Sequence, residues 1–234
     1  MLVYIKGEIM VKKNNKGMLI IVSGPSGTGK DSICNRVKNE MDNIWISISM
    51  TSREIRGNEK DGVDYYFVSK EEFEDRIKKG YFLEYATVHN NKYYGTPKDK
   101  IEEYLNKGID VILVIDIQGA IKVQKLIKSA LFIFIMPPSM EELKRRLENR
   151  NTESKDRILE RFKTAYNEIN YYKKYNYLVV NDDLDEAVSK VKAIIKAEKC
   201  RVDRIEEVYL NSFEEVMHEE LINKEFDNSE IEIK

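Results

Sequence analysis

The stretch MLIIVSGPSGTGKDS, residues 18–32, decides the fold of this chain. Its first part, Met18 to Ser23, is a continuous apolar run, which is typical of a strand buried on both faces in a parallel sheet. A glycine-rich turn follows, and Ile33, Val37 and Met41 then form one apolar stripe at helical spacing. A strand, a turn and a helix in this order indicate the first unit of an α/β domain.

Outward from this unit, the same alternation of strand and helix repeats toward the C-terminus. Short apolar runs predict strands at 45–49, 110–116, 131–136 and 177–180. Helical patterns separate them at 118–127, 139–149, 154–174 and 183–199. Residues 50–96, here called the insertion, are rich in Tyr, Phe and Thr and predict a small strand-rich unit. We therefore expect a parallel sheet flanked by helices, with its core in residues 18–49 and 97–200.

The two ends of the chain lie outside this pattern. Residues 1–17 mix Lys and Glu with a few apolar residues, which predicts a poorly ordered extension. Residues 201–234 form an acidic tail, with ten acidic and two basic residues from position 205 onward. Its apolar residues recur at helical spacing: Ile205, Val208, Tyr209, Phe213, Val216, Met217 and Leu221. This spacing predicts an amphipathic helix that packs or self-associates, so a homo-oligomer is one expectation.

Composition excludes several classes of protein. Hydrophobic residues make up 42% of the 234 residues, which is enough for a sizeable core, and no apolar run approaches the roughly 18 residues of a membrane span. The N-terminus lacks the apolar region of a secretory signal, so we expect a cytoplasmic protein. A net charge of −2 gives no indication of a nucleic-acid groove. The expected partners are therefore small molecules, without nucleic acid or membrane.

The turn after the first strand carries the clearest chemical signal. Gly24 and Lys30 fit the spacing of a Walker A motif. Its glycines let backbone N–H groups converge on phosphate oxygens, the helix N-terminus favours negative charge, and the lysine reaches the β- and γ-phosphates. We expect nucleotide phosphates to contact the whole run: Gly24, Pro25, Ser26, Gly27, Thr28, Gly29, Lys30, Asp31 and Ser32.

A second anion site is indicated at the start of the insertion. Arg53 and Arg56 stand three residues apart after a predicted strand, where guanidinium groups suit bidentate capture of a phosphate. Tyrosine hydroxyls nearby can join that capture. The carboxylate of Glu84 can accept hydrogen bonds from the ring N–H and exocyclic amine of guanine.

In this order, the segments resemble the guanylate kinase family over about residues 18–200. The resemblance rests on seven motifs in register. They are SGPSGTGK at 23–30, the serine- and arginine-containing run SISMTSREIR at 47–56, DGVDY at 61–65, YYGT at 93–96, DIQG at 116–119, PPS at 137–139 and VNDD at 180–183. Several motifs in register are far more specific than a lone Walker A motif.

The resemblance implies a P-loop kinase fold, Mg²⁺ as cofactor, and conversion of ATP and GMP to ADP and GDP. It implies that the GMP phosphate is bound by Ser49, Arg53, Arg56, Tyr65 and Tyr94. It further implies that the guanine is read by Glu84, Thr96 and Asp116. Three arginines, Arg146, Arg150 and Arg161, match those that close over the ATP phosphates with a short lid near 150–156, and Asn181 matches a position near the adenine.

Two departures from the family pattern concern the metal. Asp31 stands where a Ser or Thr normally offers its hydroxyl to Mg²⁺, and Val114 stands where an acidic residue usually precedes Asp116 by two positions. One hypothesis is a relocation, in which Asp31 supplies directly or through water the negative oxygen that Val114 lacks. The rival hypothesis is a decayed metal site.

Two alternative functions stay open at this point. The run Gly-Lys-Asp-Ser also resembles ribose 1,5-bisphosphate phosphokinase, although the intact set Glu84, Thr96 and Asp116 favours GMP because a sugar bisphosphate has no base. A guanylate-kinase-like binding module without catalysis is the other alternative. The retained glycines and Lys30 argue against it, because a module that only binds peptides needs no phosphate loop.

Overall fold

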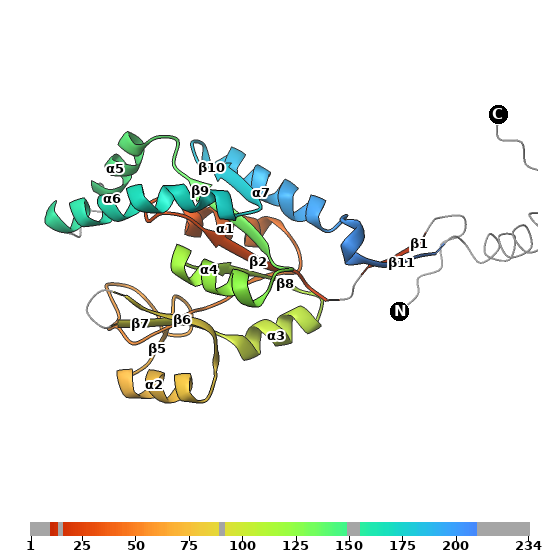
Figure 1. Ribbon diagram of the computed structural model, residues 1–234, viewed down its shortest axis with the longest axis horizontal. Helices are drawn as coiled ribbons and strands as arrows, with labels where there is room; N and C mark the ends of the chain where they lie inside the picture. Colours follow the sequence, from red (N-terminus) through yellow and green to blue (C-terminus); the bar gives the residue numbers. More distant parts are fainter. Residues whose placement is uncertain (1–9, 14–15, 89–91, 149–154, 210–234) are drawn as a thin grey trace, which may run out of the picture. The chain divides into compact units, whose positions relative to one another are not determined.

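A computed structural model describes residues 10–13, 16–88, 92–148 and 155–209 (Figure 1). The chain divides into two compact units. Residues 15–196 form the larger unit, which contains every motif of the predicted site. Residues 1–14 and 197–234 form the smaller one. No helix among the described residues is long and apolar enough to cross a membrane.

A five-stranded parallel sheet forms the centre of the larger unit. Its strand order is β10-β9-β2-β8-β3. The strands are β2 (Leu19–Ser23), β3 (Ile44–Ile46), β8 (Asp110–Val114), β9 (Leu131–Met136) and β10 (Tyr177–Val180). The predicted parallel sheet is thus confirmed. β3 and β8 end earlier than their apolar runs predict, because the chain leaves the sheet there to build the site.

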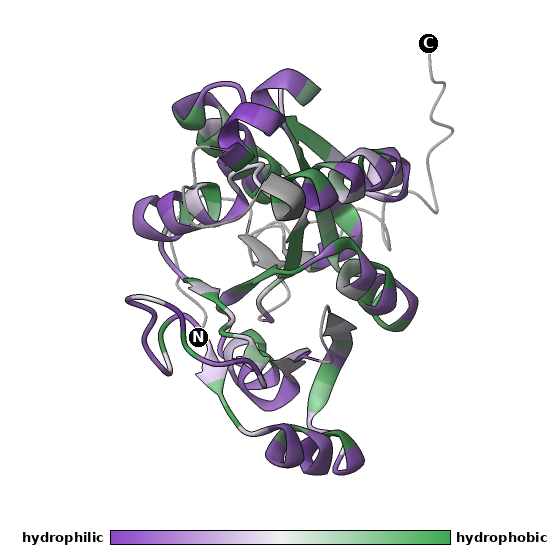
Figure 2. Cartoon of the chain, turned by 90° about the vertical axis from the view of Figure 1, so that its left-hand side faces the viewer, coloured by the Kyte–Doolittle hydropathy of each residue, from purple (hydrophilic) through white to green (hydrophobic). Residues whose placement is uncertain are grey.

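Helices cover both faces of this sheet, because alternate side chains of β2 pack against different helices. Ile20 and Val22 lie in a core cluster with residues of α1 (Lys30–Glu40) and α7 (Leu184–Glu198). Leu19 and Ile21 lie in a second cluster, with residues of α3 (Lys98–Asn106) and α4 (Ile117–Leu126). Because successive side chains of a strand point to opposite faces, every residue of this apolar run is buried. Figure 2 shows the hydrophobic strands inside and hydrophilic outer helix turns.

Two further helices, α5 (Met140–Glu148) and α6 (Lys155–Ile169), pack against each other through Leu143, Leu147 and Ala165. A short 3₁₀ helix, Asn170–Lys174, continues α6. In Figure 1 these helices lie on one side of α4 and the insertion lies on the other. The predicted lid near 150–156 falls mostly outside the described residues, and so does Arg150.

The insertion holds a second sheet, of order β5-β4-β7-β6. Its strands are β4 (Met50–Thr51), β5 (Tyr66–Phe67), β6 (Phe82–Val88) and β7 (Lys92–Pro97). The strand-rich prediction is confirmed, but it missed helix α2 (Lys70–Lys78). The signal for α2 was present, because Ser69 precedes Glu72 at the spacing of a capping box and its side chain accepts from the Glu72 N–H at 3.1 Å.

Stacked aromatic rings hold α2 on the second sheet. The Phe73 ring is fully buried between Phe82, at a centroid distance of 4.4 Å, and Tyr93, at 5.1 Å. Gly95 makes room for this stack, because a Cβ there would lie 2.8 Å from Phe82 and 2.9 Å from Phe73. The packing of this stack fixes the sheet that carries half of the predicted site.

The smaller unit corrects two predictions about the ends of the chain. Residues Met10–Lys13 form strand β1, which pairs antiparallel with β11 (Ile205–Tyr209). The prediction of a poorly ordered extension is therefore wrong for 10–13, and the predicted helix is wrong for 205–209. Pairing between segments far apart in sequence overrides a helical spacing that rests on few residues. The other apolar tail positions, Phe213 to Leu221, lie outside the described residues.

Replacing Phe73 by Ala should lower the free energy of unfolding by about 3–5 kcal/mol, because it removes a fully buried ring and leaves a cavity in the stack. Urea denaturation followed by circular dichroism measures this loss. Leu126→Ala is the control, because Leu126 is 65% exposed and its removal should change the free energy by no more than about 0.5 kcal/mol. Equal losses in both variants would contradict the assigned role of the stack.

Candidate functional site

The turn between β2 and α1 has the backbone shape of a phosphate loop. Gly24 and Gly29 have φ angles of 145° and 87°, which side chains rarely allow. A Cβ at Gly24 would lie 2.1 Å from the Ile135 carbonyl oxygen, and one at Gly29 would lie 2.4 Å from Asn181 Nδ2. Gly29 caps α1 without a side-chain hydrogen bond, so the first N–H groups of this helix face the loop.

Side chains brace this loop from within. Thr28 Oγ1 donates to the Pro25 carbonyl at 2.9 Å, and Lys30 Nζ donates to the Gly24 and Pro25 carbonyls at 2.7 and 2.9 Å. Asn181 Nδ2 donates to the Thr28 carbonyl at 2.8 Å. Asn181 is only 6% exposed. Its side chain therefore holds the loop in place, and its predicted position near an adenine stays a prediction.

One of the three predicted arginines contacts the loop, and a second contacts Asn181, which braces it. Arg161 of α6 donates to Ser26 Oγ, and Arg146 of α5 donates to the Asn181 carbonyl at 3.0 Å. Arg146 also pairs with Glu142 at 2.7 Å. Hydrogen bonds from Arg145 and Arg146 lower the pKa of Glu142 to about 2, so this carboxylate stays charged and fixes the orientation of Arg146.

A pocket of about 230 Å³ opens between the insertion and the central sheet. Most of its wall comes from residues singled out in the sequence: Ser49, Tyr65, Glu84, Tyr94 and Asp116. The rest of the lining is apolar or backbone: Ala86, Gly95, Val114 and Ile115. The fold thus collects in one place five residues spread over 68 positions of the chain, from Ser49 to Asp116.

Two carboxylates face this pocket from different elements. Glu84 of β6 is 8% exposed and accepts from Thr96 Oγ1 at 2.7 Å, so Thr96 lies behind the pocket and holds Glu84. Asp116 caps α4 by accepting from the Gly119 N–H at 2.7 Å. Burial raises the pKa of Glu84, and the charge of Asp116 adds to this effect while the Thr96 hydrogen bond opposes it. Both carboxylates suit a ligand that offers N–H groups.

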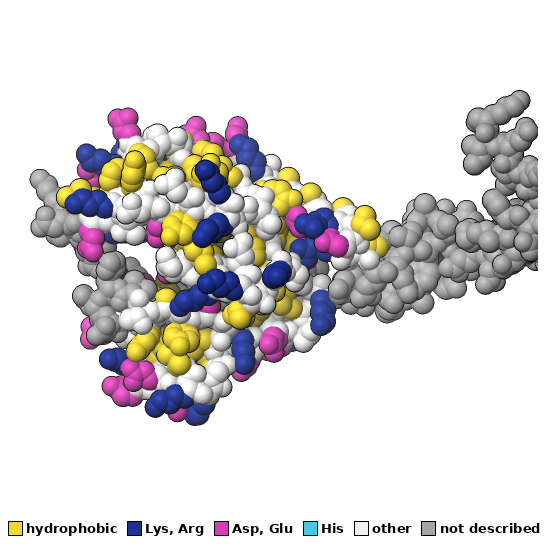
Figure 3. Space-filling view, viewed as in Figure 1, with side chains coloured by type: hydrophobic (Ala, Val, Ile, Leu, Met, Phe, Trp, Pro, Cys, Tyr) yellow, Lys and Arg dark blue, Asp and Glu magenta, His cyan; other side chains and the backbone are white. Residues whose placement is uncertain are grey.

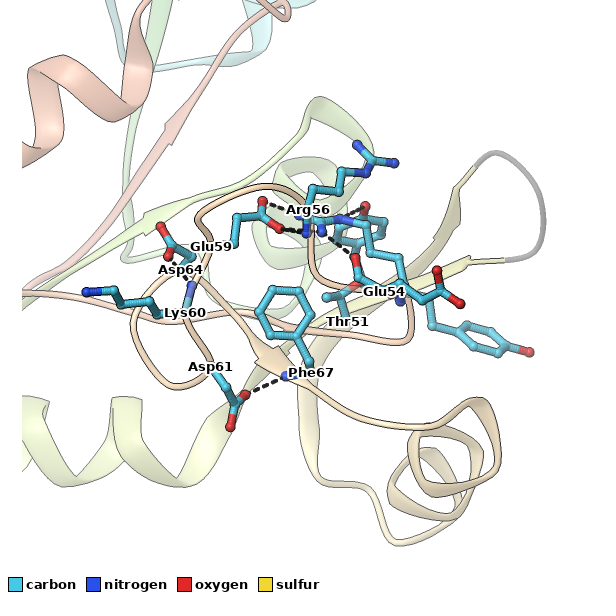
Figure 4. Close-up of polar contacts among 11 residues, drawn as sticks. Thr51, Glu54, Arg56, Glu59, Lys60, Asp61, Asp64 and Phe67 are labelled. Atoms are coloured by element: carbon cyan, nitrogen blue, oxygen red, sulfur yellow. Dashed lines mark hydrogen bonds and ion pairs between the residues drawn. The ribbon is translucent and has the colours of Figure 1, made fainter. Parts of the chain in front are cut away.

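Arg53 is buried at the edge of the pocket and already has a carboxylate partner. Its guanidinium makes two hydrogen bonds with the Glu59 carboxylate, at 2.6 and 2.7 Å. Figure 4 shows Glu59 with the dashed lines that mark its polar contacts. The Nε of Arg53 donates to the Tyr94 hydroxyl at 3.0 Å, and its guanidinium carbon lies 4.9 Å from the centroid of the Tyr65 ring. These contacts tie Arg53 to two tyrosines of the pocket.

The environment of Arg56 differs from that of Arg53, although the two arginines are only three residues apart in the sequence. The Arg56 side chain is exposed, and its backbone N–H donates to Glu59 Oε2 at 2.9 Å. Glu59 therefore organises this loop, and sequence reasoning missed it. The hydrogen bond from Arg53 is the main cause that lowers the pKa of Glu59, so Glu59 is charged at neutral pH. No spacing rule connects residues six apart in an irregular loop.

A second missed residue is Glu168 of α6. It is half-buried, and burial raises its pKa, while the positive charge of Lys30 opposes the shift and the negative charge of Asp116 adds to it. Glu168 therefore belongs to the charge environment between the phosphate loop and the pocket. A glutamate on a charged helix gives no sequence signal of this kind.

Asp31 and Val114, the two departures from the family pattern, lie at the phosphate loop and at the pocket, respectively. Asp31 is exposed in the first turn of α1, and its charge contributes, after burial and Tyr94, to the raised pKa of Tyr65 in the pocket. Val114 lines the pocket and pairs in register with Val22, the residue before Ser23 at the end of β2. Figure 3 shows the hollow between α6 and the insertion, with Lys and Arg side chains beside it.

A sequence model of one protein family, described as "Guanylate kinase", matches residues 16–198, which is most of the chain. The chain belongs to the guanylate kinase family. A guanylate kinase of Clostridium tetani is 57% identical over 206 residues, which cover 88% of this chain and 98% of that relative. One of Caldanaerobacter subterraneus is 52% identical over 200 residues, which cover 86% and 97%.

Solved structures lead to the same family. The crystal structure of guanylate kinase from Anaplasma phagocytophilum matches with a TM-score of 0.69 and 34% identity, covering 88% of this chain and 96% of that one. The guanylate kinase resemblance and the P-loop kinase fold expected from the motifs are thus confirmed. The match to named guanylate kinases at this level of identity favours guanylate kinase over the two alternatives, the sugar-phosphate kinase and the binding module.

Replacing Glu84 by Gln should stabilise the ligand-free protein at pH 7 by about 1 kcal/mol, because Gln keeps the acceptor for Thr96 without burying a charge. The folded-state pKa of Glu84 lies above its ordinary value of 4.5, so the cost of its charge is absent below pH 4.5 and appears as the pH rises through the folded-state pKa. The gain should therefore vanish in acid.

Urea denaturation at a series of pH values measures the difference between E84Q and the parent protein. Glu102→Gln, at an exposed position of α3, is the matched control and should leave the free energy nearly unchanged. A constant gain at all pH values would contradict the assigned effect of burial.

Proposed function

We propose that this member of the guanylate kinase family transfers the γ-phosphoryl group of ATP to GMP, which gives ADP and GDP. The observation that carries the proposal is the juxtaposition of two sites. The phosphate loop follows β2, and the pocket with Glu84 and Asp116 lies at the end of β8, the neighbouring parallel strand. A donor phosphate on the loop and an acceptor in the pocket would therefore meet at one edge of the sheet.

The pocket supports GMP as the acceptor. Its two carboxylates, Glu84 and Asp116, can accept hydrogen bonds from the N–H groups of guanine, whereas adenine offers an acceptor at its ring N1. Thr96 fixes Glu84 for this role. For the phosphate, the proposed ligands are Ser49, Arg53, Arg56, Tyr65 and Tyr94. The phosphate would take over part of the guanidinium of Arg53 from Glu59, so binding exchanges one anionic partner for another.

The loop supports ATP as the donor. Its backbone N–H groups and Lys30 would hold the β- and γ-phosphates, and Arg146, Arg150 and Arg161 would neutralise charge on the transferring group. Ser26, which accepts from Arg161, connects the loop to α6. The attacking oxygen of GMP is already anionic, so no general base is required. Catalysis would consist of positioning and electrostatic stabilisation.

Among the described residues near the loop, Asp31 is the one that suits Mg²⁺. The described residues contain no group of three or more His, Cys, Asp or Glu side chains that could hold a metal. The exposed carboxylate of Asp31 does suit Mg²⁺, which prefers hard oxygens and keeps several waters alongside substrate phosphates. We therefore propose Asp31 as a ligand, directly or through water. Bound Mg²⁺ would supply positive charge to the phosphates.

Purified protein with ATP and Mg²⁺ should release ADP when GMP is offered, at a rate on the order of 1–100 per second. AMP, dGMP and ribose 1,5-bisphosphate are assayed in parallel. AMP should be far slower, because adenine lacks the ring N1–H and the 2-amino group whose hydrogen bonds Glu84 and Asp116 would accept. Preference for the sugar bisphosphate, or no turnover with any acceptor, would overturn the proposal.

Replacing Asp31 by Ser should lower kcat by about 10- to 100-fold if this carboxylate has taken over the metal role. The double variant Asp31→Ser with Val114→Asp should recover part of that loss, because it returns a carboxylate to the end of β8. Steady-state kinetics over a range of Mg²⁺ concentrations measures both. Full activity of D31S alone would refute the relocation and support a decayed metal site.

A further inference from the structure

A second cavity, of about 340 Å³, lies in the same unit and shares no lining residue with the predicted GMP pocket. Its wall comes from β3, from the insertion and from α3. The volume falls within the range of small-molecule sites, which starts near roughly 300 Å³. The proposed phosphoryl transfer does not use this cavity.

The two hollows lie back to back on one layer of backbone. Ser49 lines the GMP pocket, and its neighbours Ile48 and Met50 line the second cavity. Tyr65 and Tyr66 divide between the two hollows in the same way. Around residue 49 the lining alternates as in extended chain, where successive side chains point to opposite faces. A hydrogen bond of 2.9 Å from the Tyr66 N–H to the Ser49 carbonyl joins the two segments into one wall.

The lining of the second cavity combines aromatic rings with positive charge. Trp45, Tyr66 and Tyr81 supply rings from three parts of the chain. Arg76 of α2 lies over the Tyr81 ring, with its guanidinium carbon 5.0 Å from the centroid. Aromatic faces bind flat apolar molecules well, and a guanidinium that stacks on a ring adds a surface of the same kind.

Charge in the cavity favours an anion. Arg76 and Lys100 line it, against the single carboxylate of Asp61. Both cations also pair with glutamates outside the lining, Arg76 with Glu72 at 2.6 Å and Lys100 with Glu103 at 2.8 Å, so an anionic ligand would exchange one anionic partner for another. Asp61 Oδ1 already accepts from the Phe67 N–H at 2.8 Å, so part of its acceptor capacity is used within the protein.

We propose that this cavity is a binding site for a small, flat aromatic molecule that carries one anionic group. The ring system would lie among the aromatic side chains, and the anionic group would lie toward Lys100 and Arg76. Such a ligand would bind at the same time as GMP, because the two hollows have separate linings. The site therefore adds a second ligand to the chain, independent of the phosphoryl transfer.

The chain contains a built-in reporter for this site. Trp45 is the single tryptophan of the sequence, and it lines the cavity while its other face stacks on Tyr104 at a centroid distance of 4.3 Å. Excitation of tryptophan in the full chain therefore excites a single residue beside this cavity, and the lysine variants and the GMP competition assign the transfer to the cavity. Anilinonaphthalene sulfonate is a suitable probe, since it is an aromatic anion that accepts energy from tryptophan.

The experiment titrates this probe into the full-length protein and records energy transfer from Trp45, with and without saturating GMP. We expect saturable transfer in both conditions. Lys100→Gln should raise the dissociation constant of the probe about three- to fivefold, which is the scale of a partly exposed ion pair. Lys107→Gln is the matched control. Lys100 and Lys107 pair with the same Glu103, at 2.8 and 2.7 Å, but only Lys100 lines the cavity.

Three outcomes would overturn the proposal. They are displacement of the probe by GMP, equal weakening in K100Q and K107Q, and the absence of saturable energy transfer. Circular dichroism and ADP release of both variants show whether they fold and turn over GMP as the parent does. Because the comparison of the two lysines needs no GMP, its result is distinguishable from a failure of the proposed kinase activity.

Discussion

The parallel pairing of β2 with β8 and β9 is the constraint on which the rest of the site depends. It aligns the carboxyl ends of three strands, so the phosphate loop after β2, Asp116 after β8 and the Ile135 carbonyl of β9 reach one edge. The loop packs so closely on β9 that only a glycine fits at position 24. Shifting the register of β2 by one residue would exchange its two buried faces and remove this alignment.

Charge is balanced within the protein before any substrate arrives. Glu59 pairs with Arg53, Glu142 pairs with Arg146, and Lys30 donates to the carbonyls of its own loop. These partners keep cationic side chains oriented where phosphates are expected, at the cost of a competition that each phosphate has to win. Glu84 differs from them, because burial and the negative charge of Asp116 disfavour its own charge, while the hydrogen bond from Thr96 opposes this effect.

The insertion shows how one thin layer can serve two hollows. A stack of aromatic rings holds the sheet of the insertion. It consists of Phe73, Phe82 and Tyr93, and Gly95 makes room for it. Residues 49 and 65 then reach one side, and residues 48, 50 and 66 reach the other. The two hollows thus share one layer of backbone and have separate linings.

The sequence by itself determined the parallel sheet, the phosphate loop and the order of the motifs, because apolar runs and glycine spacing act on the local backbone. It also indicated most of the pocket, including Glu84 and Asp116. Only the tertiary structure decided that Glu59 holds Arg53, that Glu168 shares the charge environment of Lys30, and that residues 10–13 and 205–209 pair as strands. These contacts carry no periodic signal in the sequence, because they depend on where irregular loops, a helix face and distant strands lie in the folded chain.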